Sequence, residues 1–151
     1  MSYTEEIRPL IGKRPLLAPG VAVLVLDPAG RILLLKRTDD GTWTLPGGYM
    51  EVDETPTAAA RREVGEEIGL SVGGLELLDV FGGPEVFHTF PNGDQVANVS
   101  IAYVTRDTAG TPRVDGKEVS QAQFFAPDAL PESLFRPILP ILSRFRAGNG
   151  G

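Results

Sequence analysis

The residues best suited to do chemistry lie between Gly47 and Leu70. This stretch carries six carboxylates, which are Glu51, Asp53, Glu54, Glu63, Glu66 and Glu67. Carboxylates held close together repel one another, so each is costly to keep ionised without a counter-ion. A divalent cation with hard oxygen ligands would relieve that repulsion. The stretch therefore favours a metal site built on a loop and a helix.

The second half of this stretch has the boundary signals of a helix. Thr55 suits the N-cap, Pro56 suits the first helical position, and Gly69 suits the position just past the end. Gly65 interrupts the interior at a cost of about 1 kcal/mol relative to alanine. We therefore expect another group to approach the backbone closely at Gly65.

Helical spacing divides the side chains of this predicted helix between two faces. The face expected to pack on the core consists of Ala60, Val64 and Ile68. A neighbouring face carries Glu63, Glu66 and Glu67, because positions three and four residues apart lie together on a helix. The helix is thus predicted to hold the three carboxylates side by side.

Composition limits the class of function. The 151 residues suit one domain, and a net charge of −6 argues against a nucleic-acid polymer as partner. With no cysteine, disulfides, thiol nucleophiles and Cys-ligated zinc are excluded. The first residues lack the features of a signal peptide, and the apolar runs are too short for a membrane span. We expect a cytoplasmic protein with no membrane partner.

The remaining elements indicate an α/β layered domain over residues 1–151. We expect a peripheral arm at 1–19, with a short strand at most, and disorder at 148–151. Predicted strands lie at 21–26, 31–37, 43–45, 75–82, 86–90, 95–106 and 118–126. The first two are expected to form a hairpin about the turn at 27–30, and Asn92-Gly93 predicts a type I′ turn in a second hairpin. A final helix is predicted from Pro137, with an apolar set of Ile138, Leu139, Ile141, Leu142 and Phe145.

The spacing within the acidic stretch matches a known pattern. It reads Gly48, five residues, Glu54, seven residues, then Arg62-Glu63-Val64-Gly65-Glu66-Glu67-Ile68-Gly69-Leu70. This resembles the signature box of the Nudix hydrolase family (MutT-like proteins) at every specified position. The flanking Trp43-x-Leu45-Pro46-Gly47-Gly48 and Phe124-Phe125-x-Pro127 segments are also similar to Nudix sequences. One departure is Asp53, where many members have glycine.

The resemblance implies a Nudix α/β/α sandwich with a mixed sheet and a metal-dependent hydrolase. The reaction would be water attack at phosphorus in a nucleoside diphosphate linked to a group X, with Mg²⁺ or Mn²⁺ as cofactor. Candidate substrates are ADP-ribose and other nucleotide sugars, dinucleoside polyphosphates, and (deoxy)nucleoside triphosphates. The alternative is a non-catalytic Nudix-fold module that senses nucleotides. The box is complete and no DNA-binding segment is added, which favours the enzyme.

The resemblance also suggests roles for individual residues. The expected metal ligands are the Gly48 carbonyl, Glu63, Glu66, Glu67 and Glu118. Glu63, Glu67 and Glu118 are the expected catalytic carboxylates, with Glu118 as an accessory ligand or base. Arg62 is expected to bridge to Glu54 or Glu51 and so fix the loop against the helix, although it is also spaced to pair with Glu66.

Other side chains are weaker candidates. Arg37, Phe87 and Tyr103 are predicted to contact substrate, although a surface arginine and core aromatic residues explain them equally well. Trp43 is expected to pack rather than stack on a base. A lone histidine, His88, does not support a histidine-based metal site. The apolar hairpin that carries Phe87 also allows a homodimer.

Overall fold

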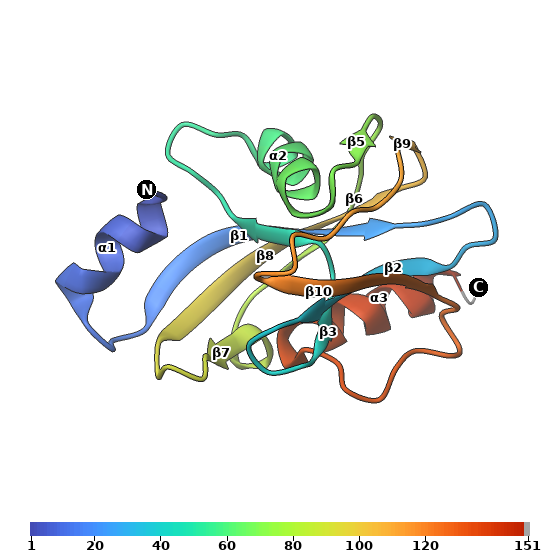
Figure 1. The fold of residues 1–151 in the computed structure, drawn as a ribbon. Helices are drawn as coiled ribbons and strands as arrows, with labels where there is room; N and C mark the ends of the chain where they lie inside the picture. The colour runs from blue at the N-terminus through green and yellow to red at the C-terminus, as the bar shows by residue number, and fades with distance from the viewer. Residues whose placement is uncertain (150–151) are drawn as a thin grey trace.

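The computed structural model describes residues 1–149 and shows two helices on opposite sides of a set of strands (Figure 1). The α-helices are α1 (Tyr3–Ile11), α2 (Pro56–Ile68) and α3 (Leu139–Asn149), and the 3₁₀ helices are η1 (Pro84–Val86) and η2 (Arg136–Ile138). The strands are β1 (Leu16–Val25), β2 (Ile32–Arg37), β3 (Trp43–Thr44), β4 (Gly47–Tyr49), β5 (Ser71–Val72), β6 (Glu76–Phe81), β7 (Phe87–Thr89), β8 (Gln95–Thr105), β9 (Thr108–Ala109) and β10 (Val119–Phe125).

Within residues 1–149, the strands form three sheets. The largest has the order β4-β1-β8-β6, with β7 also paired to β8. Its β1–β8 pair is parallel and its other pairs are antiparallel. A second sheet has the order β10-β2-β3, and β5 pairs with β9. The predicted α/β fold with a mixed sheet is therefore confirmed.

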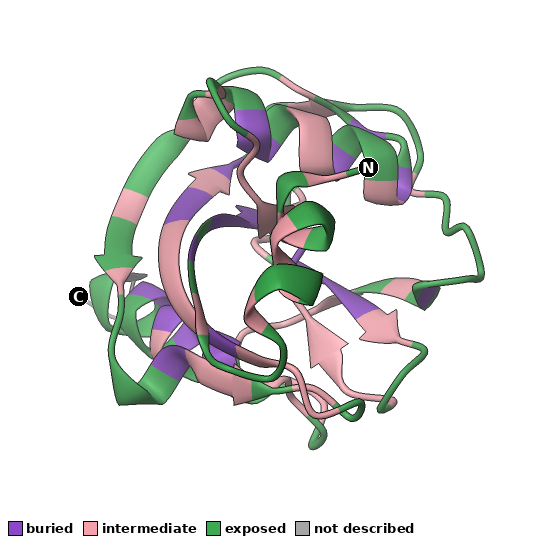
Figure 2. Ribbon diagram, turned by 90° about the vertical axis from the view of Figure 1, so that its left-hand side faces the viewer, coloured by how far each residue is buried: buried purple, intermediate pink, exposed green. Residues whose placement is uncertain are grey.

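Alternation along β1 builds the two sides of the core. Val21, Val23 and Val25 pack in the cluster that contains the buried face of α2. Ala22 and Leu24 face the other way, into the cluster that contains α3. Successive side chains of a strand point to opposite faces, so one strand serves both layers. Figure 2 shows the resulting buried band between exposed outer surfaces.

The boundaries predicted for the central helix are those of α2. The Thr55 hydroxyl accepts a hydrogen bond from the Ala58 N–H, and Pro56 is the first helical residue. Gly69 ends the helix in the left-handed conformation, with φ of 72°. Ala60, Val64 and Ile68 are fully buried, as predicted. The acidic residues thus lie on the face of α2 that neighbours this buried face.

The predicted hairpin of the first two long strands is wrong. Only an isolated bridge between Leu26 and Ile32 joins them, and β2 instead pairs with β10 and β3. The reason is that both edges of β1 are occupied, one by β4 and the other by β8.

Trp43 of β3 packs edge-on against Phe125, with ring centroids 5.0 Å apart. Packing was the role expected of Trp43.

The hairpin of β7 and β8 is confirmed, but its turn is not type I′. That turn requires positive φ at Asn92, and within residues 1–149 only Asp53 among non-glycine residues has positive φ. The Asn92 side chain instead accepts a hydrogen bond from the Asp94 N–H at 2.9 Å. This local bond holds Asn92 in an ordinary Asx turn.

The two chain ends also differ from expectation. The arm at 1–19 contains a helix, α1, and its residues from 16 onward belong to β1. Within the predicted apolar set of the last helix, Leu139 is exposed and the other four side chains are buried. The predicted disorder at 148–151 falls partly on residues 150–151, which lie outside the described residues, and α3 extends to Asn149. The helices of residues 1–149 are all too short or too polar to cross a membrane.

The expectation that a group approaches Gly65 closely is wrong, and this generates a stability prediction. A β-carbon built there would lie 3.8 Å from the Leu70 carbonyl oxygen, its nearest neighbour. We expect Gly65→Ala to raise the free energy of unfolding by about 0.5–1 kcal/mol, because alanine loses less backbone entropy in a helix. Thermal unfolding should show a Tm increase of roughly 1–4 °C.

The matched control is Gly69→Ala at the end of the same helix. Gly69 has positive φ, and its β-carbon would lie 3.1 Å from the Arg113 guanidinium. This variant should lower Tm. A Gly65→Ala chain with unchanged or lower Tm would contradict the assignment of Gly65 as an unconstrained glycine.

Candidate active site

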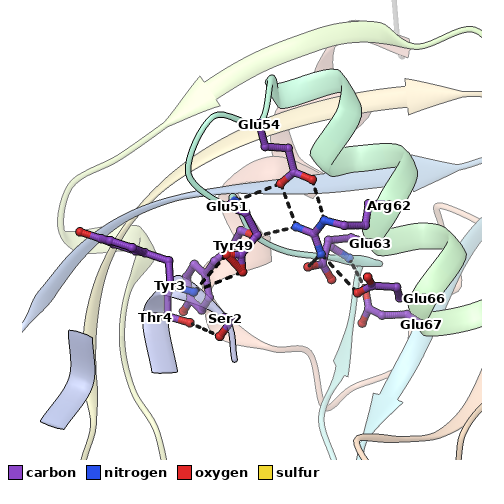
Figure 3. A network of polar contacts seen from close by, with 11 residues as sticks. Ser2, Tyr3, Thr4, Tyr49, Glu51, Glu54, Arg62, Glu63, Glu66 and Glu67 are labelled. Atoms are coloured by element: carbon purple, nitrogen blue, oxygen red, sulfur yellow. Dashed lines mark hydrogen bonds and ion pairs between the residues drawn. The ribbon is translucent and has the colours of Figure 1, made fainter. Parts of the chain in front are cut away.

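The centre of the candidate site is the guanidinium of Arg62 (Figure 3). It forms a fork with Glu54, with Nε to Oε2 at 2.6 Å and Nη2 to Oε1 at 2.9 Å. The same side chain donates to Glu63 at 2.8 Å and Glu66 at 3.2 Å, and to the Tyr49 carbonyl at 3.1 Å. This fork lowers the pKa of Glu54 below its ordinary value. The predicted bridge from Arg62 to Glu54 is present, and the pairing with Glu66 exists beside it.

Glu63 lies directly against the backbone of β4. A β-carbon built on Gly48 would be 2.5 Å from the Glu63 carboxyl carbon, so a larger residue there would force the Glu63 carboxylate away from the strand. Burial raises the pKa of Glu63, and the Arg62 hydrogen bond opposes that rise. Glycine at position 48 is therefore a steric requirement for bringing the carboxylate to the strand.

Glu67 is held by the same strand. Its Oε1 accepts a hydrogen bond from the Gly47 N–H at 2.7 Å. Burial, together with the charges of Glu63 and Glu118, raises the pKa of Glu67 to about 8, against the opposing effect of that hydrogen bond. A carboxylate that is costly to ionise is common at functional sites.

Glu118 reaches this cluster from a separate part of the chain, just before β10. It lines the same cavity as Glu67, and its charge is one of the causes that raise the pKa of Glu67. The turn before it is organised by Asp115, whose Oδ1 accepts backbone hydrogen bonds from Lys117 at 2.9 Å and Glu118 at 3.2 Å. Sequence reasoning found Glu118 but not the support that Asp115 gives it.

Glu51 does not contact Arg62 as one of the alternatives predicted. Its backbone N–H donates to Glu54 at 3.0 Å, which helps to close the loop. Its carboxylate accepts from the Tyr3 N–H at the start of α1, at 3.0 Å. Glu51 thus joins the acidic loop to the N-terminal helix (Figure 3).

These groups line one cavity of about 730 Å³. It brings together most of the predicted site, which is Gly48, Glu51, Arg62, Glu63, Glu66, Glu67, Glu118 and Arg37. Glu54 is outside the lining and reaches the site only through its ion pair with Arg62. Two predicted substrate contacts lie elsewhere in the described structure. Tyr103 is buried in the core cluster beneath α2, and Phe87 is on β7 outside the lining.

The cavity has an aromatic end, in which Phe135 is a residue that sequence reasoning missed. Phe90 and Phe135 line it, and the Arg37 guanidinium carbon lies 5.5 Å and 4.3 Å from their ring centroids. His88 packs between the same two rings, and burial lowers its pKa. Phe135 lies 92 residues after Trp43, yet its N–H donates to the Trp43 carbonyl at 2.8 Å. Only tertiary structure brings it to the site.

The donor set suits a hard divalent cation. It offers carboxylate oxygens from two segments, in a partly buried setting that disfavours unpaired negative charge. No three acidic or histidine side chains among the described residues converge on one point at metal-ligand distances. Glu63 and Glu66 both turn toward Arg62, which is the counter-charge that the protein itself supplies.

Comparison with known proteins places this cavity in context. A family model described as "NUDIX domain" matches residues 16–145. A "MutT-like protein" of Streptomyces ambofaciens is 48% identical over 67 residues, which cover 44% of each chain and so less than half of that relative. An "ADP-ribose pyrophosphatase" of Methanocaldococcus jannaschii is 34% identical over 155 aligned positions, covering 98% of this chain and 88% of that protein. The crystal structure of a MutT NUDIX hydrolase from Burkholderia pseudomallei superimposes with a TM-score of 0.73 at 29% identity, covering 85% of this chain and 98% of that one.

The raised pKa of Glu67 generates a prediction about stability in chelator-treated protein. The pKa rises from an ordinary 4.5 to about 8 on folding, so the folded chain binds this proton more tightly than the unfolded chain. The associated stability is present at low pH and is lost as pH rises toward 8. Glu67→Gln removes this titration. We therefore expect the Tm of the variant minus that of the wild type to increase between about pH 5 and about pH 8.

The control is Glu76→Gln, which removes an exposed glutamate of β6 outside the cavity. Its Tm difference from the wild type should stay level across the same pH range. Thermal unfolding followed by circular dichroism measures both. A Glu67→Gln difference that is flat, or that shrinks with pH, would show that Glu67 is not held in a strained ionised state.

Proposed function

Because this chain belongs to the Nudix hydrolase family, we propose that it hydrolyses the pyrophosphate linkage of a nucleoside diphosphate joined to a group X, with Mg²⁺ or Mn²⁺ as cofactor. The observation that carries the proposal is the position of Glu63 and Glu67, partly buried at the wall of a cavity of about 730 Å³. A cavity of that size accommodates a nucleotide-sized ligand. Its carboxylates alone would repel a pyrophosphate, so the proposal includes the metal.

The proposed ligands are the carboxylates of Glu63, Glu66 and Glu67 and the carbonyl of Gly48, with Glu118 as an accessory ligand. When bound, the metal would neutralise charge that builds at phosphorus and lower the pKa of a water molecule for in-line attack. The role of Arg62 is to tie Glu54, and with it the acidic loop, to α2. Arg62 also binds Glu63 and the carbonyl oxygen of Tyr49, which is the residue next to Gly48. This support therefore keeps Gly48 and Glu63 close together.

The carboxylates of Glu63 and Glu67 are proposed to act in water activation, and Glu118 is proposed to act as an accessory ligand or base. Glu118 comes from the segment before β10 and lies in the same cavity as the α2 carboxylates. A base mounted on a different element can receive a proton without disturbing the ligands on the helix.

Support for the substrate class comes from the relatives. The "ADP-ribose pyrophosphatase" aligns with nearly the whole chain, including the N-terminal arm. We therefore include ADP-ribose and other nucleotide sugars beside dinucleoside polyphosphates and (deoxy)nucleoside triphosphates. The substrate is a small phosphorylated molecule in each case.

The test is a panel of these nucleotides with Mg²⁺ or Mn²⁺, with products identified by mass spectrometry. We expect cleavage of one phosphoanhydride bond, and loss of at least about 100-fold in kcat for Glu67→Gln. Glu76→Gln, which removes a glutamate outside the cavity, should retain wild-type turnover. Full turnover in Glu67→Gln would overturn its assigned role. Saturable binding of ADP-ribose without any product would instead identify a nucleotide-sensing module.

A further inference from the structure

The N-terminal helix α1 forms a wall of the candidate active site. Ser2, Thr4 and Glu5 line the same cavity as the acidic cluster of α2. Figure 3 shows Ser2 and Thr4 beside Tyr49 and close to Glu51. The family model begins at residue 16, so this wall lies outside the part of the chain that it matches.

The helix is attached mainly through polar contacts at its two ends. Near its start, the Tyr3 N–H binds the Glu51 carboxylate at 3.0 Å. Near its end, Arg8 donates to the Gln95 carbonyl at 2.8 Å, and Lys13 pairs with Asp94 at 2.8 Å. No residue of α1 is buried, and a second cavity of about 350 Å³ lies between it and the strands. The helix α1 thus lines the cavity but adds no buried residue to the core.

The groups that α1 presents are suited to bind hydroxyls. The side-chain oxygens of Ser2 and Thr4 lie 3.2 Å apart and form a hydrogen bond. The Glu5 side chain accepts from the Ser2 N–H at 3.4 Å, which leaves acceptor capacity on its carboxylate. Hydroxyls that both donate and accept, beside a carboxylate acceptor, complement the alternating donors and acceptors of a polyol.

The charge of the lining disfavours additional phosphate groups. The carboxylates that line the cavity are Glu5, Glu51, Glu63, Glu66, Glu67 and Glu118. Two arginine side chains line it, and both are already paired. Arg37 lies 2.6 Å from Asp39, and Arg62 binds Glu54 and Glu63. A metal at α2 would serve the cleaved diphosphate, but a further phosphate at the α1 wall would meet acidic side chains.

We propose that this cavity selects nucleoside diphosphates in which X is an uncharged polyol, and that Ser2, Thr4 and Glu5 of α1 contact the hydroxyl groups of X. The proposal rests on the proposed function, because the cleaved diphosphate must lie at the acidic cluster for X to reach α1. It separates nucleotide sugars from nucleoside triphosphates and dinucleoside polyphosphates.

The test keeps adenosine constant and varies X. ADP-ribose, ADP-glucose, ATP and diadenosine tetraphosphate are compared as substrates of the full chain with Mg²⁺ or Mn²⁺. We expect kcat/KM for the two nucleotide sugars to exceed that for the two polyphosphates by at least about tenfold. Equal values, or a preference for either polyphosphate, would overturn the inference and leave the proposed hydrolase function intact.

Variants of α1 then test the residues. Thr4→Val removes a hydroxyl with little change of shape and should raise KM for ADP-ribose roughly fivefold with kcat unchanged. Thr4→Ser should restore it. Glu5→Lys reverses the charge of the wall and should raise kcat/KM for ATP roughly tenfold. Glu5→Gln removes the charge but keeps a side-chain acceptor for the helix cap. Glu6→Lys is the matched control, because Glu6 is an exposed neighbour outside the lining.

The outcomes separate the two proposals. Thr4→Val and Glu5→Lys chains that match the wild type and Glu6→Lys on every substrate would show that α1 does not contact X. If the chain binds ADP-ribose but cleaves nothing, the hydrolase proposal fails, and dissociation constants from calorimetry on the same variants decide the selectivity. If the chain neither binds nor cleaves any of the four nucleotides, both proposals fail.

Discussion

The structure around the cavity depends on one constraint, which is the repulsion among carboxylates that share a small, partly buried space. Arg62 relieves it by binding Glu54, Glu63 and Glu66 at once. Because a planar guanidinium presents several donors in fixed directions, one side chain can link the loop and the helix. Glu67 instead accepts a hydrogen bond from the Gly47 N–H at 2.7 Å, and burial keeps its pKa raised. Within the cluster, the negative charge of Glu54 is therefore stabilised and that of Glu67 is destabilised.

That constraint explains why the backbone around the cluster is so specific. A side chain at position 48 would displace the Glu63 carboxylate, and Gly47 must lack a side chain because its β-carbon would overlap the Val21 carbonyl oxygen. The loop that follows contains Asp53 with φ of 69°, a conformation that glycine adopts more easily. The family pattern that has glycine at this position is thus explained by backbone geometry. Here the chain accepts an aspartate at a conformational cost, while the Arg62–Glu54 fork fixes the loop.

The sequence predicted what depends on local signals and missed what depends on long-range pairing. The ends of α2, its buried stripe and its acidic face follow from capping residues and helical spacing, all within 15 residues. The partners of β1 do not, because β4 and β8 come from distant segments and compete with β2 for its edges. The burial of Tyr103 in the core and the position of Phe135 at the cavity could not be predicted either, because both depend on contacts between distant segments. For α1 a local signal existed, since Ser2 and Glu5 form a capping box, but its docking on Glu51 is a tertiary contact.

The proposed chemistry and the proposed selectivity depend on two helices, α2 and α1, in which substitutions should have different effects on stability. The acidic face of α2 is bound to the core through Ala60, Val64 and Ile68, so a change in its position would disturb packing across the domain. The wall formed by α1 has no buried residue and is attached by polar contacts at its ends. Exposed positions held in this way tolerate substitution with small effects on stability. A scaffold built like this can keep one reaction at α2 while the side chains of α1 change which group X is accepted.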